Sequence, residues 1–141
     1  MTGPAAANRI YQHPIRVYWE DTDAGGIVFY ANYLKFFERA RTEWLRSLGI
    51  AQGALREATG GIFVVSETSL RYLQPARLDD ELLVTARLLE AGRASLIIAQ
   101  QATMKRDGAL LCEGTIRIGW VDAQRLRPAR IPPIILEALA Q

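Results

Sequence analysis

Two carboxylates and two glycines stand together in the segment Asp21–Gly26, directly before a long helical pattern. A carboxylate such as Asp23 can attack a carbonyl group as a nucleophile or deprotonate a water molecule. Gly25 and Gly26 let the backbone approach a ligand without interference from a Cβ atom. We predict that this segment is a reactive loop, with an ordinary turn of aspartates and glycines as the alternative.

The helix after this loop would add hydrogen-bond donors to the carboxylates. The first turn of a helix has backbone N–H groups without intrahelical partners, and the helix dipole gives that end a partial positive charge. Such donors can hold the negative oxygen that develops when a carbonyl carbon is attacked. The combination predicts an acyl-type site in which one aspartate, Asp23, does the chemical work.

The composition excludes other kinds of site. The chain has one cysteine and one histidine, so it cannot form an intrachain disulfide or a cluster of histidine metal ligands. A triad with a histidine base would need His13, whose position before Pro14 favours an exposed or capping role. Cys112 lies in a strand-like run and is predicted to be a small core residue. We expect no metal and no cofactor, and the single thiol suits a reducing, cytoplasmic compartment.

Length and charge limit the organisation of the chain. Its 141 residues predict one domain over residues 1–141, with a flexible lead at residues 1–10. The 17 basic and 15 acidic residues give a net charge of +2, too small a basic excess for a dedicated nucleic-acid binder. No apolar run approaches the roughly 20 residues of a membrane span, and the N-terminal segment lacks the apolar stretch of a secretory signal.

A long amphipathic helix is the clearest element, and its start would carry the backbone donors. From Tyr33, apolar residues recur at offsets of 3, 4, 7, 11, 12 and 15, which predicts a helix of about 17 residues with one apolar stripe. Asn32 is expected to cap it and Gly49 to end it. Arg39 and Glu43 are spaced for an ion pair on the polar face. The apolar stripe requires a sheet to cover it.

Five strand-like segments would supply that sheet. They are Ile15–Glu20, Ile62–Leu73, Glu81–Glu90, Ser95–Lys105 and Leu110–Val121. Short connections, one of them the Asp107–Gly108 turn, predict an antiparallel meander of the last three. A short helix over Ile134–Leu139 would follow. The order predicts an α+β fold in which one long helix lies across a curled antiparallel sheet of about five strands.

Several strands carry apolar residues on the face that the helix would not reach. These residues are Leu83, Leu89, Ile97, Leu111 and Val121. Because exposed apolar surface is costly, this pattern predicts that a second chain packs on that face or along a sheet edge.

The segment from Trp19 to Leu48 resembles the signature of a known family. Its residues Asp-Thr-Asp-Ala-Gly-Gly-Ile-Val-Phe-Tyr-Ala-Asn-Tyr-Leu-Lys-Phe-Phe-Glu-Arg-Ala-Arg are similar to the hotdog-fold acyl-CoA thioesterases of the 4-hydroxybenzoyl-CoA thioesterase type. The resemblance is strongest to the tol–pal system-associated branch, and the strand pattern extends it over residues 11–133. It implies a long central helix wrapped by a curved sheet, and dimers or tetramers with active sites at subunit interfaces.

The resemblance also implies roles for individual residues. Asp23 corresponds to the catalytic carboxylate, and the backbone N–H of Tyr30 corresponds to the oxyanion donor. The tol–pal branch often has His where this chain has Tyr30 and Tyr where it has Trp19, so any role for an imidazole is absent here. The implied reaction hydrolyses the thioester of acyl-CoA, or of an acyl carrier protein, with Asp23 as nucleophile or general base.

Further residues are implied to contact the substrate. Those near the reacting group are Trp19, Gly25, Gly26 and Tyr33. Ser66 and Thr68 would contact the pantetheine arm. Arg93, Arg125 and Arg127 would contact the coenzyme A phosphates. The alternative for the serine, the threonine and the arginines is an ordinary solvated surface position.

Two other functions fit the same scaffold. One is a non-catalytic module that binds acyl-CoA or an acyl carrier protein. The other is a dehydratase, which the position of the sole His13 ahead of the first strand disfavours.

Overall fold

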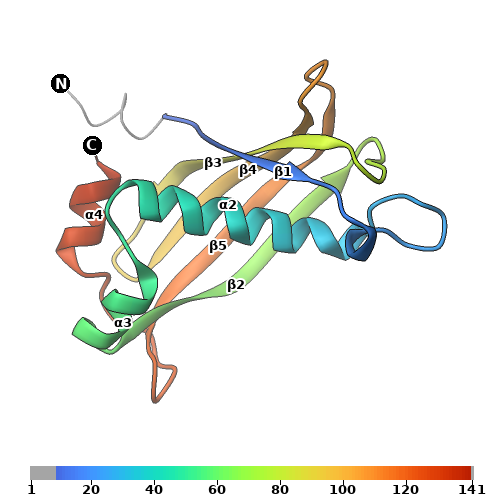
Figure 1. Ribbon diagram of the computed structural model, residues 1–141. Coiled ribbons are helices and arrows are strands. Elements are labelled where there is room, and N and C mark those ends of the chain that lie inside the picture. Colours follow the sequence, from blue (N-terminus) through green and yellow to red (C-terminus); the bar gives the residue numbers. More distant parts are fainter. Residues whose placement is uncertain (1–8, 141) are drawn as a thin grey trace.

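The computed structural model describes residues 9–140, so most of the lead predicted at residues 1–10 lies outside the described residues. A five-stranded antiparallel sheet curls around one long helix (Figure 1). The strands are β1 (Tyr11–Arg16), β2 (Gly61–Tyr72), β3 (Glu81–Ala91), β4 (Ser95–Met104) and β5 (Leu110–Asp122). The helices are α2 (Tyr33–Ser47), α3 (Gln52–Thr59) and α4 (Pro133–Leu139), with 3-10 turns η1 (Trp19–Asp21) and η2 (Tyr30–Asn32). The predicted α+β architecture is confirmed.

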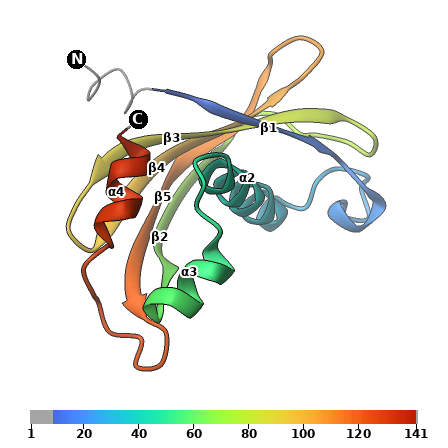
Figure 2. The same ribbon diagram turned by 60° about the vertical axis from the view of Figure 1, so that its left-hand side comes forward.

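The strand order is β1-β3-β4-β5-β2, and every neighbouring pair is antiparallel. The predicted meander of β3, β4 and β5 forms the centre of the sheet. The strand that follows the long helix joins the far side of β5, so β1 and β2 are the two edges. Figure 2 shows how the curl of the sheet encloses α2. Within residues 9–140, no helix is both long and apolar enough to span a membrane.

The first strand lies earlier in the chain than predicted. The alternation over Ile15–Glu20 indicated a strand there, but the paired residues are Tyr11–Arg16 and the chain turns at Trp19–Asp21. The Asp21 carboxylate accepts the Tyr18 N–H at 2.8 Å, and the Asp21 N–H donates to the Tyr18 carbonyl at 3.0 Å. These local bonds compete with sheet pairing and end the strand.

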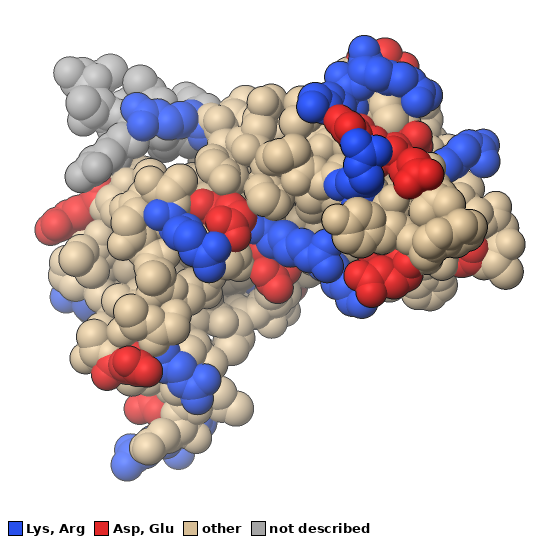
Figure 3. Space-filling view, in the orientation of Figure 1, with Lys and Arg blue, Asp and Glu red and all other residues tan. Residues whose placement is uncertain are grey.

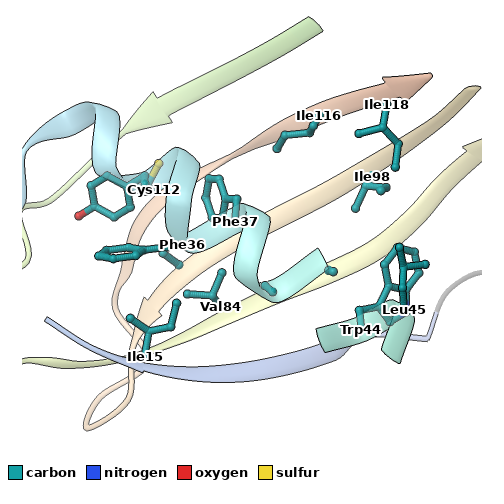
Figure 4. Close-up of a cluster of buried hydrophobic side chains, with 14 of the residues drawn as sticks. Ile15, Phe36, Phe37, Trp44, Leu45, Val84, Ile98, Cys112, Ile116 and Ile118 are labelled. Carbon is teal, nitrogen blue, oxygen red and sulfur yellow. The ribbon is translucent and has the colours of Figure 1, made fainter. Parts of the chain in front are cut away.

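The apolar stripe of α2 is buried against the concave face of the sheet, as predicted. The fully or nearly fully buried apolar side chains of α2 are Tyr33, Phe36, Phe37, Ala40, Trp44 and Leu45. Figure 4 shows Phe36, Phe37, Trp44 and Leu45 of this helix in one cluster with Val84, Ile98 and Ile116 from three strands. Burying an aromatic or aliphatic side chain of this kind contributes about 1.5–3 kcal/mol.

The ends of α2 agree in part with the prediction. The helix has 15 residues, and Gly49 beyond its end has a φ of +86°, a left-handed conformation that glycine adopts without strain. Asn32 does not cap the helix with its side chain; its Nδ2 group donates to the Asp21 carbonyl at 2.8 Å. The expected pair between Arg39 and Glu43 is wrong, because Glu43 pairs with Arg46 at 2.6 Å.

Two of the residues expected on the outer face are instead buried. Leu111 lies at a bulge between the pairs Ala102–Cys112 and Thr103–Leu110, which breaks the alternation of faces. Val121 is covered by the chain itself, which returns after β5 and pairs with it at Pro128. On the outer face, Leu83 and Ile97 are half-buried and Leu89 is exposed.

The two scarce side chains lie within strands. His13 is half-buried on β1 opposite Val84, rather than exposed or capping. Cys112 is fully buried in β5, as predicted, and burial raises the pKa of its thiol to about 12. Because the thiolate is the reactive form, Cys112 is an inert core residue.

The helix α3 was not predicted. Its eight residues make about two turns, too few for a clear apolar period. It ends at Gly60, whose φ is +75°. The terminal helix α4 was predicted and begins one residue earlier, at Pro133.

Candidate functional site

Asp21 organises the loop that precedes α2. Its side chain is buried, and its carbonyl accepts both the Phe29 N–H at 3.0 Å and the Asn32 side-chain amide at 2.8 Å. These bonds join the end of β1 to the start of the helix. Together with the Tyr18 N–H that its carboxylate accepts, these bonds make Asp21 a structural residue of the loop.

Asp23 is the exposed carboxylate of the pair. Its N–H donates to the Ile27 carbonyl at 2.9 Å and its own carbonyl accepts the Gly26 N–H at 3.0 Å. The side-chain Oδ1 accepts the Gly25 N–H at 2.8 Å, and the second oxygen, Oδ2, makes no hydrogen bond within residues 9–140. One carboxylate oxygen is thus held by the loop, while the other has no partner within residues 9–140.

Glycine occupies two positions of the loop, each for a different structural reason. Gly26 has a φ of +79°, which other residues adopt only with strain. At Gly25 a Cβ atom would stand 3.2 Å from the Asp23 Oδ1 atom. Glycine there lets the carboxylate lie close to the backbone N–H groups of its own loop.

The start of the helix carries the donors that the sequence predicted. Tyr30 opens η2, which runs directly into α2. The Phe29 and Asn32 N–H groups are used by loop carbonyls, whereas those of Tyr30 and Ala31 take no acceptor in the loop or cap bonds of residues 9–140. In this loop Asp23 faces Ile27, Thr22 faces Val28 and Asp21 faces Phe29. The free donor of Tyr30 follows directly after the last of these pairs.

An exposed aromatic surface surrounds this end of the helix. Trp19 is 79% exposed and Tyr30 62%, and both were predicted to be near the substrate. Tyr72, the last residue of β2, and Leu73 after it are also exposed, and the Tyr30 and Tyr72 rings meet in a T-shaped arrangement with their centroids 6.0 Å apart. Neither residue was predicted to belong to the site, although two apolar residues directly before Gln74-Pro75 are a signal that the sequence contains. A connected apolar surface of this kind indicates a ligand or a partner.

Tyr33 lies beneath that surface rather than on it. It is 3% exposed, its ring contacts Phe36 and Tyr72, and its hydroxyl has no hydrogen-bond partner within residues 9–140. Burial raises the pKa of Tyr33 to about 12. Tyr33 could therefore contact a substrate only from within the core.

We expect Tyr33→Phe to stabilise the protein, and increasingly so at alkaline pH. A buried unpaired hydroxyl costs about 1–3 kcal/mol. The unfolded chain releases the Tyr33 proton near pH 10 and the folded chain near pH 12. Between these values the unfolded state binds fewer protons, so this group lowers the free energy of unfolding by about 1.4 kcal/mol per pH unit as pH rises.

Urea unfolding across this range measures the effect. The advantage of Tyr33→Phe over the unchanged protein is expected to grow from pH 10 to pH 12. Tyr18→Phe, at an exposed tyrosine, is the control and should show no such growth. A constant difference across the range would contradict the prediction, because it would mean that folding does not raise the pKa of Tyr33.

The other predicted contacts lie on β2 and at the opposite end of the sheet. Ser66 and Thr68 are exposed on β2, where a bulge follows Val65. Arg93 lies in the β3–β4 turn, and the remaining two predicted arginines, Arg125 and Arg127, lie in the loop after β5. Both loops are at the α3 end of the sheet, far from the Asp21–Gly26 loop (Figure 1). One chain does not bring the arginines and Asp23 together, and Asp23 lines none of the four main cavities found within residues 9–140.

Comparisons with known proteins agree with this architecture. The family model of the thioesterase-like superfamily matches residues 17–139. The chain is 40% identical to the Haemophilus influenzae acyl-CoA thioesterase YbgC over 122 residues, covering 86% of this chain and 88% of that protein. It is 38% identical to the Escherichia coli acyl-CoA thioester hydrolase YbgC over 132 residues, covering 94% and 97%.

A solved structure supports the same assignment. The Thermus thermophilus protein TT1821 superposes with a TM-score of 0.83 and 31% identity, covering 93% of this chain and 95% of that one. The family match spans the Asp23 loop, the long helix and all of the sheet except β1. The chain therefore belongs to the thioesterase-like superfamily, with the hotdog fold, and is a thioester hydrolase.

Proposed function

We propose that this protein is an acyl-CoA thioesterase that releases a free acid and coenzyme A, with Asp23 as its catalytic carboxylate. The relatives named as acyl-CoA thioesterases are 38–40% identical over most of both chains, which supports the substrate class. The observation that carries the residue assignment is that Asp23, with its free Oδ2, lies in the loop that leads directly into the unpaired N–H groups at the start of η2.

The thioester carbonyl oxygen would accept the Tyr30 N–H as negative charge develops on it. In one route an Asp23 oxygen bonds to the carbonyl carbon, the C–S bond breaks, and water then hydrolyses the mixed anhydride. In the other route Asp23 takes a proton from a water whose oxygen bonds to the same carbon. In both, the thiolate leaves and takes a proton from solvent. An oxyanion donor of this kind typically contributes about 3–4 kcal/mol to lowering the barrier.

The active form in this proposal is a homodimer, with a dimer of dimers as its larger form. Within the described residues β2 pairs on one side only, and Val65 and Tyr72 on it are exposed. Antiparallel pairing of two β2 edges about a two-fold axis would satisfy those strands. It would also bring the Arg93 end of one copy toward the Asp23 loop of the other. A molar mass of at least twice that of one chain is the expected result of sedimentation equilibrium.

The proposal includes a cytoplasmic location and a place in the tol–pal system-associated branch. The reduced, buried Cys112 supports the first. The resemblance of residues 19–48 supports the second.

A thiol-release assay tests the function. Purified protein is given short, long and aromatic acyl-CoAs and an acyl carrier protein carrying the same acyl groups, without added metal. We expect thiol release from at least one acyl-CoA and slower release from the carrier protein. Saturable binding of acyl-CoA without any thiol release would identify a non-catalytic binding module instead.

A further inference from the structure

Arg77 is a cation beside the Asp23 loop to which the proposed reaction gives no role. It lies in the connection between β2 and β3, and this connection runs along the loop because Ile27 pairs with Arg77 in an antiparallel bridge. In the same ladder the Val28 N–H donates to the Ala76 carbonyl at 2.8 Å. On its other side Ile27 faces Asp23, whose N–H donates to the Ile27 carbonyl at 2.9 Å. Asp23, Ile27 and Arg77 therefore stand in one row across three neighbouring segments.

The side chains of this row lie on the solvent side of the ladder. Residues directly opposite one another in an antiparallel ladder carry their side chains on the same face, and the next residues along carry theirs on the other face. The next residues along, Val28 and Ala76, are buried in the core. In agreement with this alternation, Asp23 and Arg77 are exposed and Ile27 is half-buried. Because cross-strand Cβ atoms lie about 5 Å apart, the carboxylate and the guanidinium flank a single apolar side chain.

The Arg77 guanidinium takes part in none of the ion pairs found within residues 9–140. Figure 3 shows side chains of both charges gathered at this end of the molecule. Asp80 accepts the Arg77 backbone N–H at 2.8 Å with Oδ2, and its Oδ1 lies 3.8 Å from Arg106. The other acid of this turn, Asp79, is exposed and its charge is screened by water and salt. The planar fork of N–H donors on Arg77 is therefore available to a ligand.

We propose that Arg77 is a specificity-determining residue that selects acyl groups ending in a carboxylate. The thioester carbonyl would lie at Asp23, a short methylene chain over Ile27, and the distal carboxylate on the Arg77 guanidinium. This inference rests on the proposed function, because it names the acyl group of that same site. An arginine fork matches the two oxygens of a carboxylate, and such charge-assisted bonds are roughly twice as strong as neutral ones. The pantetheine arm near the sulfur offers Arg77 only neutral amide oxygens.

Thiol release from matched acyl-CoA pairs of equal chain length tests the inference. One pair is adipoyl-CoA with hexanoyl-CoA, and the other is suberoyl-CoA with octanoyl-CoA. In at least one pair we expect the kcat/KM of the dicarboxylic member to exceed that of the neutral member about tenfold. Neutral acyl groups that are hydrolysed as efficiently as their dicarboxylic partners in both pairs would overturn the inference.

Variants assign the preference to Arg77. Arg77→Met should lower kcat/KM about tenfold for the dicarboxylic substrate and leave it unchanged for the neutral one. Arg77→Glu should reverse the preference, which a loss of structure cannot do. Arg39→Met is the matched control and should keep the preference, because Arg39 is an exposed arginine on α2 that is likewise in none of the ion pairs within residues 9–140. An equal loss on both substrates in Arg77→Met would show a contact with the pantetheine arm or a purely structural role, and would overturn the inference.

Binding to Asp23→Asn separates this inference from the proposed function. Isothermal titration of that variant should show at least one dicarboxylic acyl-CoA bound about tenfold more tightly than its neutral partner. The difference should disappear when Arg77→Met is added to Asp23→Asn. Because this preference does not depend on turnover, a protein that releases no thiol would contradict the proposed hydrolysis and leave the binding preference measurable. Equal binding of both members of both pairs by Asp23→Asn would overturn the role of Arg77.

Discussion

Asp23→Asn is expected to reduce thioester hydrolysis by a factor of at least about 100, because an amide can neither attack the carbonyl nor take a proton from water. Substrate affinity should stay near normal. The amide oxygen of Asn can still accept the Gly25 N–H that Asp23 Oδ1 accepts at 2.8 Å, so the loop should keep its conformation. Steady-state kinetics on the best acyl-CoA from the thiol-release assay give kcat and KM separately.

The matched control for this variant is Glu20→Gln. Glu20 is an exposed acid in the same segment. Replacing it by glutamine removes the same charge from the neighbourhood of the loop. Its kcat should remain close to that of the unchanged protein. If Glu20→Gln and Asp23→Asn lose activity equally, the effect is one of local charge. If Asp23→Asn keeps its kcat, Asp23 is not the catalytic carboxylate.

Gln100→Ala is expected to lower the free energy of unfolding by about 3 kcal/mol or more, the largest stability effect that we expect. Gln100 is 1% exposed and joins three elements. Its Oε1 accepts the Arg41 guanidinium, and its Nε2 donates to the carbonyls of Phe37 at 3.0 Å and Thr85 at 3.1 Å. Truncation would leave a buried cation and two carbonyls short of partners, and a cavity beside α2.

Gln101→Ala is the control, because it shows the effect of removing a glutamine side chain from β4 that does not join buried elements. Gln101 is exposed, and the one acceptor that its side chain contacts within residues 9–140 is Glu113 at 3.4 Å. Its removal should change the free energy of unfolding by no more than about 0.5 kcal/mol. Urea unfolding with an unchanged m-value measures both variants. Similar midpoints for the two would show that Gln100 contributes no more than a surface side chain.

The long helix and the four strands after it could be predicted because each has a strong local pattern. The stripe from Tyr33 and the alternation over β3 bury one face, and their limits agree with the prediction within a few residues. The prediction was wrong where local patterns compete with other bonds. The Ile15–Glu20 alternation was overridden by the Asp21 carboxylate, and the bulge at Leu111 turned an expected outer residue inward.

The candidate site also has features that local patterns predict and features that they do not. The Asp-x-Asp and Gly-Gly pattern alone predicted a reactive loop, because an acidic, glycine-containing turn before a helix start is a local feature. Only the folded structure shows which of the two aspartates is buried. Asp21 is 4% exposed and its carboxylate accepts the Tyr18 N–H, whereas Asp23 is exposed. Tyr72, at the end of β2, contacts the Tyr30 ring next to the candidate site. The two residues are too far apart in the chain for a local sequence pattern to predict this contact.

The sequence by itself determined the fold class and the family resemblance, and it predicted the loop that carries the candidate catalytic carboxylate. These depend on neighbours in the chain, namely apolar periods and the residue types of one turn. The tertiary structure alone decided that Arg41 is buried against Gln100, that Tyr33 is in the core, and that the arginines lie at the far end from Asp23. The physical reason is that burial and pairing depend on which side chains a folded sheet brings together, and residues such as Arg41 and Gln100 are 59 positions apart in the chain.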